Sequence, residues 1–141
     1  MSTIRYLLFL LLSFSTVQVS AGSSSQLSFD AELSQFSYPF EIQSFTLESQ
    51  NQSLSMRYMD VGNQQSEKVI VLLHGKNFSG YYWKRIAEDL IKLGYRVIIP
   101  DQIGFGKSSK PEYYQYSFSQ LASNTQSLLK SLDIQAYTVV G

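Results

Sequence analysis

The amino-acid sequence predicts an α/β fold with a mostly parallel sheet and helices on both of its faces. Three apolar runs, 69–73, 97–99 and 137–140, lack polar alternation, which is typical of strands buried on both sides. Helical patterns of apolar residues separate these runs along the chain. Strands that alternate with helices are joined by right-handed crossovers, so the three runs should lie parallel in one sheet.

An antiparallel hairpin is expected ahead of the first buried strand. Segments 45–47 and 54–58 alternate apolar and polar side chains, and polar residues 49–52 lie between them. Such alternation indicates strands with one buried face, and a short polar connection indicates a turn. The hairpin should therefore form an antiparallel edge of the sheet.

The first helix is predicted to begin after Ser79 and to end at Gly94, because serine is a common N-cap and glycine a common helix terminator. Its apolar residues recur at spacings of three and four: Trp83, Ile86, Ala87, Leu90 and Leu93. The aromatic run 81–83 can line a substrate pocket, but the helical pattern favours a packed Trp83 and an exposed Tyr81.

The second helix is predicted to begin at Ser117, where Ser117-Phe-Ser-Gln120 has the pattern of a capping box. One face then carries a stripe of mostly apolar residues: Phe118, Leu121, Thr125, Leu128, Leu129 and Leu132. This stripe should face the sheet.

Residues 1–21 are predicted to be a cleaved signal peptide. Arg5 closes a short positive region, segment 6–14 is apolar, and Val19-Ser-Ala21 has the small residues of a cleavage site. A membrane anchor is the alternative, but the apolar run is well short of the roughly twenty residues that span a bilayer. The protein should then have no stable membrane anchor and be secreted or periplasmic after cleavage near Ala21.

Two further parts follow the signal peptide. Residues 22–39 are rich in Ser and Gln with scattered aromatics, and we interpret them as an extended leader whose aromatics are able to dock onto the domain. Residues 40–141 carry the strand and helix patterns and form the folded domain.

Composition narrows the classes of function. Eleven Lys and Arg balance eleven Asp and Glu, which argues against a nucleic-acid partner because such proteins need a basic face. The chain has no cysteine, so disulfides, thiolate metal sites and thiol catalysis are excluded. His74 is its single histidine. No metal and no organic cofactor is predicted, and the sequence gives no indication of the oligomeric state.

Two segments should lie at the carboxyl ends of the buried strands, where ligands bind in sheets of this kind. One is His74–Gly80, and the other is Pro100–Ser108. Gly104-x-Gly106 in the second segment also suggests a dinucleotide site. That fingerprint needs a third glycine or alanine and an immediate helix, whereas Ser109 and a loop-like stretch follow here, so we disfavour it.

Taken together, these motifs resemble the N-terminal half of an α/β-hydrolase. The resemblance rests on Leu72-Leu-His-Gly75, Trp83, Gly94–Asp101 and Gly104-Phe-Gly-Lys-Ser108, in order and at the right spacing, and it covers residues 40–141. It implies that the chain stops after the fifth strand of the fold. In this family the strand resembling Tyr137–Gly141 runs directly into the turn that carries the nucleophile.

The resemblance assigns an oxyanion-hole role to the loop after His74-Gly75. Two backbone N–H groups stabilise the oxyanion of acyl transfer, one from this loop and one from the residue after the nucleophile. The backbone N–H of Lys76 is the first candidate donor and that of Asn77 the second. The alternative is that Lys76 is only a solvated loop lysine. In either case we expect its side chain to be solvated, since only its backbone amide is proposed as a donor.

The other motif residues are expected to shape the loops. His74 matches the family's loop-bracing histidine rather than the general base, and Asp101 should organise its turn rather than act as a catalytic acid. Gly104 and Gly106 should permit positive φ angles or close backbone approach, although ordinary glycine turns remain an alternative. Gly75 and Ser108 complete the two motifs.

A serine hydrolase needs a nucleophile, an acid and a histidine base, in that order in this fold. None of the three is expected within the chain, which should be inactive alone. The primary hypothesis is a fragment of a secreted enzyme that hydrolyses ester- or amide-type bonds of a small-molecule substrate through a serine beyond Gly141. The alternative is a non-catalytic secreted binding protein on a reduced hydrolase scaffold.

Lys76 also bears on the type of reaction. Dehalogenases resembling this family place a halide-binding Asn directly after His-Gly, and epoxide hydrolases usually have an aromatic residue there. The lysine therefore favours an esterase-, lipase- or peptidase-like activity.

Overall fold

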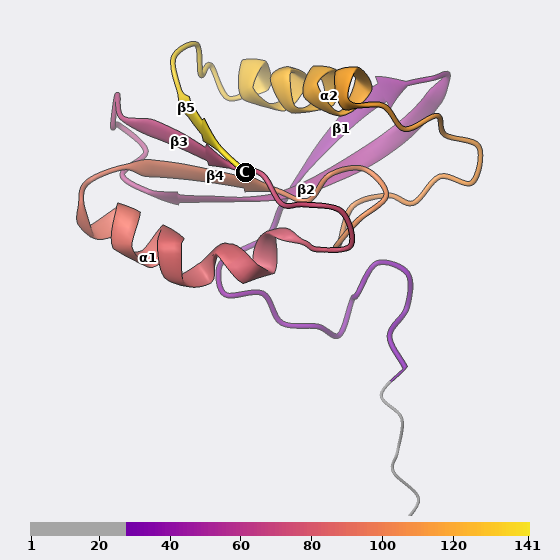
Figure 1. Cartoon of the computed structure of the whole chain (residues 1–141), viewed down its shortest axis with the longest axis horizontal. Coiled ribbons are helices and arrows are strands. Elements are labelled where there is room, and N and C mark those ends of the chain that lie inside the picture. Colours follow the sequence, from indigo (N-terminus) through magenta and orange to yellow (C-terminus); the bar gives the residue numbers. More distant parts are fainter. Residues whose placement is uncertain (1–27) are drawn as a thin grey trace, which may run out of the picture.

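A computed structural model describes residues 28–141 of the chain (Figure 1). The predicted signal peptide, residues 1–21, and the first part of the leader lie outside the described residues. The elements, in chain order, are β1 (Gln43–Ser49), β2 (Gln52–Gly62), β3 (Val69–Leu72), a 3₁₀ helix η1 (Gly80–Trp83), α1 (Lys84–Lys92), β4 (Arg96–Pro100), α2 (Phe118–Ser131) and β5 (Thr138–Val140).

The strands form one mixed sheet in the order β1-β2-β4-β3-β5. Strands β3, β4 and β5 are parallel, as the uninterrupted apolar runs predict. The hairpin β1–β2 is antiparallel, and β2 also pairs antiparallel with β4. The predicted antiparallel edge is thus confirmed, although its strands are longer than the alternating segments indicate.

Helix α1 covers one face of the sheet and α2 covers the other (Figure 1). Successive side chains of a strand point to opposite faces, so a strand between two helices needs apolar residues at every position. In β4, Ile98 packs with α2, whereas Val97 and Ile99 pack with α1. This requirement explains why the central strands have no polar alternation.

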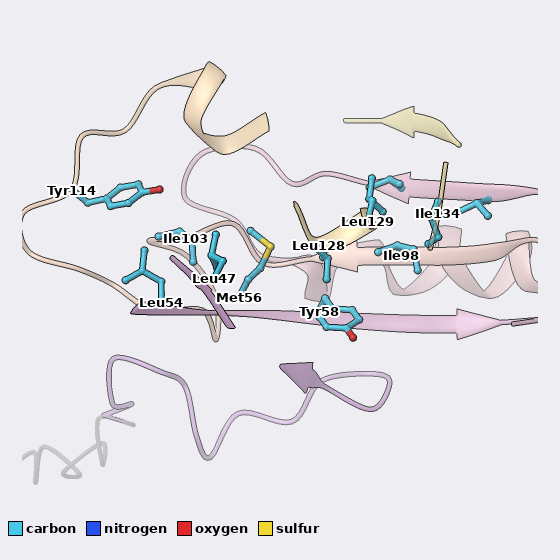
Figure 2. Packing of buried hydrophobic residues seen from close by; sticks show 12 residues of the cluster. Leu47, Leu54, Met56, Tyr58, Ile98, Ile103, Tyr114, Leu128, Leu129 and Ile134 are labelled. Atoms are coloured by element: carbon cyan, nitrogen blue, oxygen red, sulfur yellow. The ribbon is translucent and has the colours of Figure 1, made fainter. Parts of the chain in front are cut away.

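The core under α2 is the larger of the two and extends to the hairpin (Figure 2). Leu128 and Leu129 of α2 pack there against Met56 and Ile98, and all four side chains are almost completely buried. On the other face, the small Ala87 allows α1 to approach the sheet closely, next to the buried Trp83. Tyr81 is 41% exposed, so the expected contrast between Tyr81 and Trp83 is confirmed.

The helix boundaries follow the predicted signals, with a difference at the start of each helix. The Ser117 side chain accepts a hydrogen bond from the backbone N–H of Gln120, at 3.1 Å. The Gln120 side chain bonds Asn124 instead of returning to Ser117, so only half of the capping box forms. After Ser79 the chain first makes η1, with no side-chain cap, and Gly94 ends the turn after α1 with a φ of +83°.

Three predicted core positions are exposed. Ile86 and Leu93 are 46% and 68% exposed, because the buried stripe of this helix is narrow and centred on Trp83 and Ala87. Phe118 is 94% exposed, since it lies nearly two turns before the first buried residue of α2, Asn124.

Strand β5 also differs from the expectation of burial on both faces. Val139 and Val140 are 51% and 42% exposed among the described residues. The reason is their place in the sheet, because β5 is an edge strand that pairs only with β3.

Candidate functional site

Asp101 follows β4 directly and joins four parts of the chain. Its carboxylate is buried and accepts three hydrogen bonds, from the backbone N–H of Gly80 at 2.6 Å, from the backbone N–H of Lys107 at 2.7 Å and from the Tyr38 hydroxyl at 2.7 Å. Its own backbone N–H donates to the carbonyl of Arg57 in β2. These three donors supply the hydrogen bonds that a buried carboxylate requires.

Two glycines make room for this carboxylate. A Cβ atom on Gly106 would lie 2.1 Å from Asp101 Oδ2, and Gly106 has a φ of +52°. A Cβ on Gly80 would come within 2.9 Å of Ile99 and 3.3 Å of Asp101 Oδ1. Both loops can therefore bring their backbones to Asp101 only because these positions lack a side chain.

His74 links the two loops at the carboxyl ends of β3 and β4. It is 8% exposed, and its Nε2 accepts a hydrogen bond from the backbone N–H of Gln102 at 2.9 Å. Since Nε2 is the acceptor, the proton of the neutral ring is on Nδ1, which donates to the carbonyl of Gly75 at 2.9 Å. Both ring nitrogens are thus engaged with backbone groups, and Phe105 packs against the ring edge.

Ser108 and Ser109 attach the second loop to β2. The Ser108 hydroxyl is fully buried, donates to the carbonyl of Asp101 at 2.6 Å and accepts from the backbone N–H of Arg57 at 2.8 Å. Ser109 exchanges backbone and side-chain hydrogen bonds with Ser55. Between them and Asp101 the chain turns at Gly104, whose φ is +95°.

Lys76 and Asn77 occupy the two central positions of a turn. The backbone N–H of Phe78 donates to the carbonyl of Gly75 at 3.2 Å, and Asn77 has a φ of +67°, as the third residue of such a turn requires. Both side chains are exposed. Within residues 28–141, neither the N–H of Lys76 nor that of Asn77 has a hydrogen-bond partner.

An open groove of about 410 Å³ lies beside this turn. Most of its lining comes from the segments that follow β3 and β4, and includes Asn77, Phe105 and two further aromatic residues, Phe78 and Tyr82. Lys110 also reaches the groove, and burial lowers the pKa of its ammonium group. The remaining wall comes from Ala31 and Leu33 in the leader.

The sequence motifs did not identify this leader wall or the lysines near it. Lys107 Nζ donates to the carbonyl of Leu33, and Lys110 Nζ donates to the carbonyls of Gly106 and Ser108. The only available signal was the scatter of aromatic residues in the leader. Two of these, Phe36 and Tyr38, pack against Tyr81.

Residues 28–141 bring together no group of three or more His, Cys, Asp or Glu side chains suited to a metal ion. None of the helices in this part of the chain is long and apolar enough to cross a membrane.

The sequence model of the α/β hydrolase fold family matches residues 68–141, which is more than half of the chain. The chain belongs to this family. The matched region includes β3, β4 and β5, both helices and both loops of the site.

The chain spans about a quarter to a third of the length of the curated relatives that it matches. It is 45% identical over 83 residues to a mesoderm-specific transcript protein of Mus musculus, covering 58% of the chain and 25% of that protein. It is 36% identical over 89 residues to a non-heme chloroperoxidase of Synechocystis, described as putative, covering 63% and 31%. It is 33% identical over 93 residues to a haloalkane dehalogenase of Psychrobacter cryohalolentis, covering 65% and 30%.

Solved structures agree with the family. A probable hydrolytic enzyme of Pseudomonas aeruginosa superposes with a TM-score of 0.77 at 45% identity, over 80% of this chain and 36% of that one. A haloalkane dehalogenase of Paraglaciecola agarilytica superposes with a TM-score of 0.66 at 29% identity, over 72% and 34%. Hydrolases are therefore among the relatives of this chain in both sequence and structure.

Proposed function

We propose that this chain supplies the oxyanion loop of a secreted hydrolase that cleaves ester- or amide-type bonds of a small molecule. The nucleophile is a serine beyond Gly141, in the protein that continues past that residue and is called the full-length protein below. The signal-peptide pattern of residues 1–21 supports secretion.

The two unpartnered amides of the turn carry this proposal. An oxyanion hole needs backbone N–H groups that are fixed in place and free to donate. The turn fixes the amides of Lys76 and Asn77, and His74 holds the carbonyl of Gly75 just before them. The Asn77 side of the turn opens onto the groove, where a substrate has room.

The position of Gly141 supports the same arrangement. The backbone N–H of Leu73 donates to the carbonyl of Val140 at 2.8 Å, and Gly141 lies beside the Leu73 carbonyl. The end of β5 is therefore next to the start of the loop that holds His74 and Lys76 (Figure 1). A nucleophile about two residues further on would lie near this turn, since a residue adds at most about 3.3–3.6 Å.

Similarity alone leaves the reaction open, because haloalkane dehalogenases and epoxide hydrolases are among the similar structures. Lys76 supports ester or amide hydrolysis. It stands where the dehalogenase pattern has a halide-binding asparagine and where epoxide hydrolases usually have an aromatic residue.

Labelling with a fluorophosphonate tests the proposal. The full-length protein should react at one serine beyond residue 141, identified by peptide mass spectrometry, and chain 1–141 should not react. An aspartate at that position, or a correctly folded full-length protein that neither labels nor hydrolyses p-nitrophenyl acetate, would overturn the serine mechanism.

A non-catalytic binding protein on the same scaffold is the second candidate. The mesoderm-specific transcript proteins, which are 42–45% identical over 83–84 residues, have names that specify no reaction. Absence of labelling, together with binding of an apolar ligand in the groove, would favour this candidate.

A further inference from the structure

We propose that Ala31 and Leu33 of the leader form a specificity wall of the substrate groove, with Leu33 in contact with the apolar part of the substrate. The proposal rests on the proposed function, because it names the group that the groove accepts. The leader precedes the family match, which begins at residue 68.

Three separate contacts fix the leader against the domain. The Tyr38 hydroxyl donates to Asp101 Oδ2 at 2.7 Å, and Lys107 Nζ donates to the carbonyl of Leu33. Phe36 packs edge-on against Tyr81, with their ring centroids 5.0 Å apart. Because Asp101 and Lys107 also shape the second loop, the leader is attached to the same framework that positions the site.

Local hydrogen bonds fix the leader backbone around Leu33. The Asp30 carboxylate accepts from the backbone N–H of Ser34 at 2.8 Å, and the backbone N–H of Leu33 donates to the Asp30 carbonyl at 3.1 Å. Leu33 itself has a φ of +51°, a left-handed conformation that is unfavourable for a leucine and needs support from its surroundings. The Lys107 contact to its carbonyl provides such support.

The wall faces an apolar groove that continues to the turn. Leu33 and Ala31 line this groove together with Phe78, Tyr82 and Phe105, which are aromatic side chains without charge. Asn77, one of the two candidate oxyanion donors, lines the same groove. A substrate whose carbonyl oxygen is held at the turn would therefore place an adjoining alkyl or acyl chain against Leu33.

The test compares p-nitrophenyl acetate with p-nitrophenyl octanoate in the full-length protein. Leu33→Ala should raise the KM for octanoate, so that the ratio of kcat/KM for octanoate to that for acetate falls roughly tenfold, in line with the value of a few buried methylenes. Leu33→Met should restore most of the ratio. Leu93→Ala makes the same chemical change at a 68% exposed position at the end of α1 and should not alter the ratio.

A second readout does not depend on turnover. The thiol of a Leu33→Cys variant should react with N-ethylmaleimide, and millimolar n-octanol should slow that reaction severalfold, whereas the thiol of a Leu93→Cys variant should not be protected. If n-octanol protects the thiol of Leu33→Cys but the full-length protein hydrolyses neither ester, the proposed function is rejected, whereas the proposal that Leu33 lines the ligand groove is supported. Hydrolysis with an unchanged ester ratio in Leu33→Ala, or with no protection of the thiol in Leu33→Cys, would reject the wall.

Discussion

Gly106 contacts Asp101 so closely that no side chain fits between them. A Cβ atom at position 106 would lie 2.1 Å from Oδ2 of Asp101 and 2.2 Å from its Cγ, and Gly106 also has a φ of +52°. The next residue, Lys107, donates its backbone N–H to the same Oδ2 at 2.7 Å. This close approach ties the second loop of the site to the end of β4.

Gly106→Ala should therefore destabilise the protein more than the backbone angle alone explains. The left-handed conformation costs an alanine roughly 1–2 kcal/mol. Displacement of the carboxylate adds the loss of at least one charged hydrogen bond, worth about 1.5–3 kcal/mol. We expect a loss of about 3–5 kcal/mol in the free energy of unfolding, measured by urea denaturation of the full-length protein.

Gly94→Ala is the matched control for this change. Gly94 has a φ of +83°, but a Cβ there would meet nothing within 4 Å. This variant should lose only the conformational part, roughly 1–2 kcal/mol. If Gly106→Ala and Gly94→Ala lost the same free energy of unfolding, displacement of the Asp101 carboxylate would not destabilise the protein.

The ion pair between Asp60 and Arg96 should contribute strongly because it is buried. Arg96 binds both carboxylate oxygens, at 2.7 and 3.0 Å, and the side chains of Arg96 and Asp60 are only 14% and 4% exposed. Arg96→Met would leave the buried Asp60 carboxylate without its arginine partner and, within residues 28–141, with Gln64 as its one remaining side-chain donor. We expect a loss of about 3–5 kcal/mol in urea denaturation.

Lys92→Met tests whether burial is the cause. Lys92 and Asp89 also form a close pair, at 2.9 Å, but their side chains are 73% and 63% exposed. Exposed pairs are screened by water, so this variant should unfold at nearly the same urea concentration as the wild type. A loss as large as that of Arg96→Met would contradict the explanation.

Much of the fold was predictable because local pattern and burial agree. The apolar runs 69–73 and 97–99 correspond to the central strands β3 and β4, since a strand covered by helices on both faces needs apolar side chains on both of them. The same pattern does not give the exposure of Val139 and Val140, because within residues 28–141 β5 pairs with β3 alone. The helical spacing of apolar residues also predicted more buried side chains in and around α1 than the structure has. Ala87 is buried against the sheet, whereas Ile86 and Leu93 are exposed.

The sequence predicted those parts of the site that lie within a short motif. The turn at Lys76 and Asn77 and the loop at Gly104–Ser108 follow signals of a few adjacent residues. The contacts of Tyr38 with Asp101 and of Leu33 with Lys107 span 63 and 74 residues of sequence. No periodicity or spacing encodes such contacts, since they arise only when the folded sheet brings the leader and the loop together.

Tyr38→Phe should weaken the protein in a way that depends on pH. Burial is the main cause that raises the pKa of Tyr38 above its ordinary value of 10.0, so the hydroxyl keeps its proton and donates to Asp101. Above pH 10 the unfolded chain loses this proton while the folded protein retains it. Since the unfolded state then binds fewer protons, stability must fall as pH rises.

The phenylalanine variant lacks this titration. At pH 8 it should be less stable than the wild type by about 1.5–3 kcal/mol, the value of a hydrogen bond to a charged group. The difference should narrow between pH 10 and 11 in urea denaturation. Tyr113→Phe, at an 88% exposed position, should follow the wild type at every pH. A gap that is constant with pH would show that the Tyr38 hydroxyl is not held protonated by the fold.

Lys76→Pro tests the oxyanion donor, because proline removes one backbone N–H and leaves the turn in place. Position 76 is the second residue of the turn from Gly75 to Phe78, where proline is favoured, and Asn77 keeps its φ of +67°. Loss of one donor should lower kcat for p-nitrophenyl acetate by about 10²–10³ in the full-length protein.

Lys76→Ala completes the comparison, since it removes the exposed ammonium group but keeps the amide. Its kcat should stay within a few-fold of the wild type if only the backbone acts. A slow Lys76→Ala variant would assign the effect to the side chain. A Lys76→Pro variant with wild-type kcat would instead transfer the donor role to the amide of Asn77.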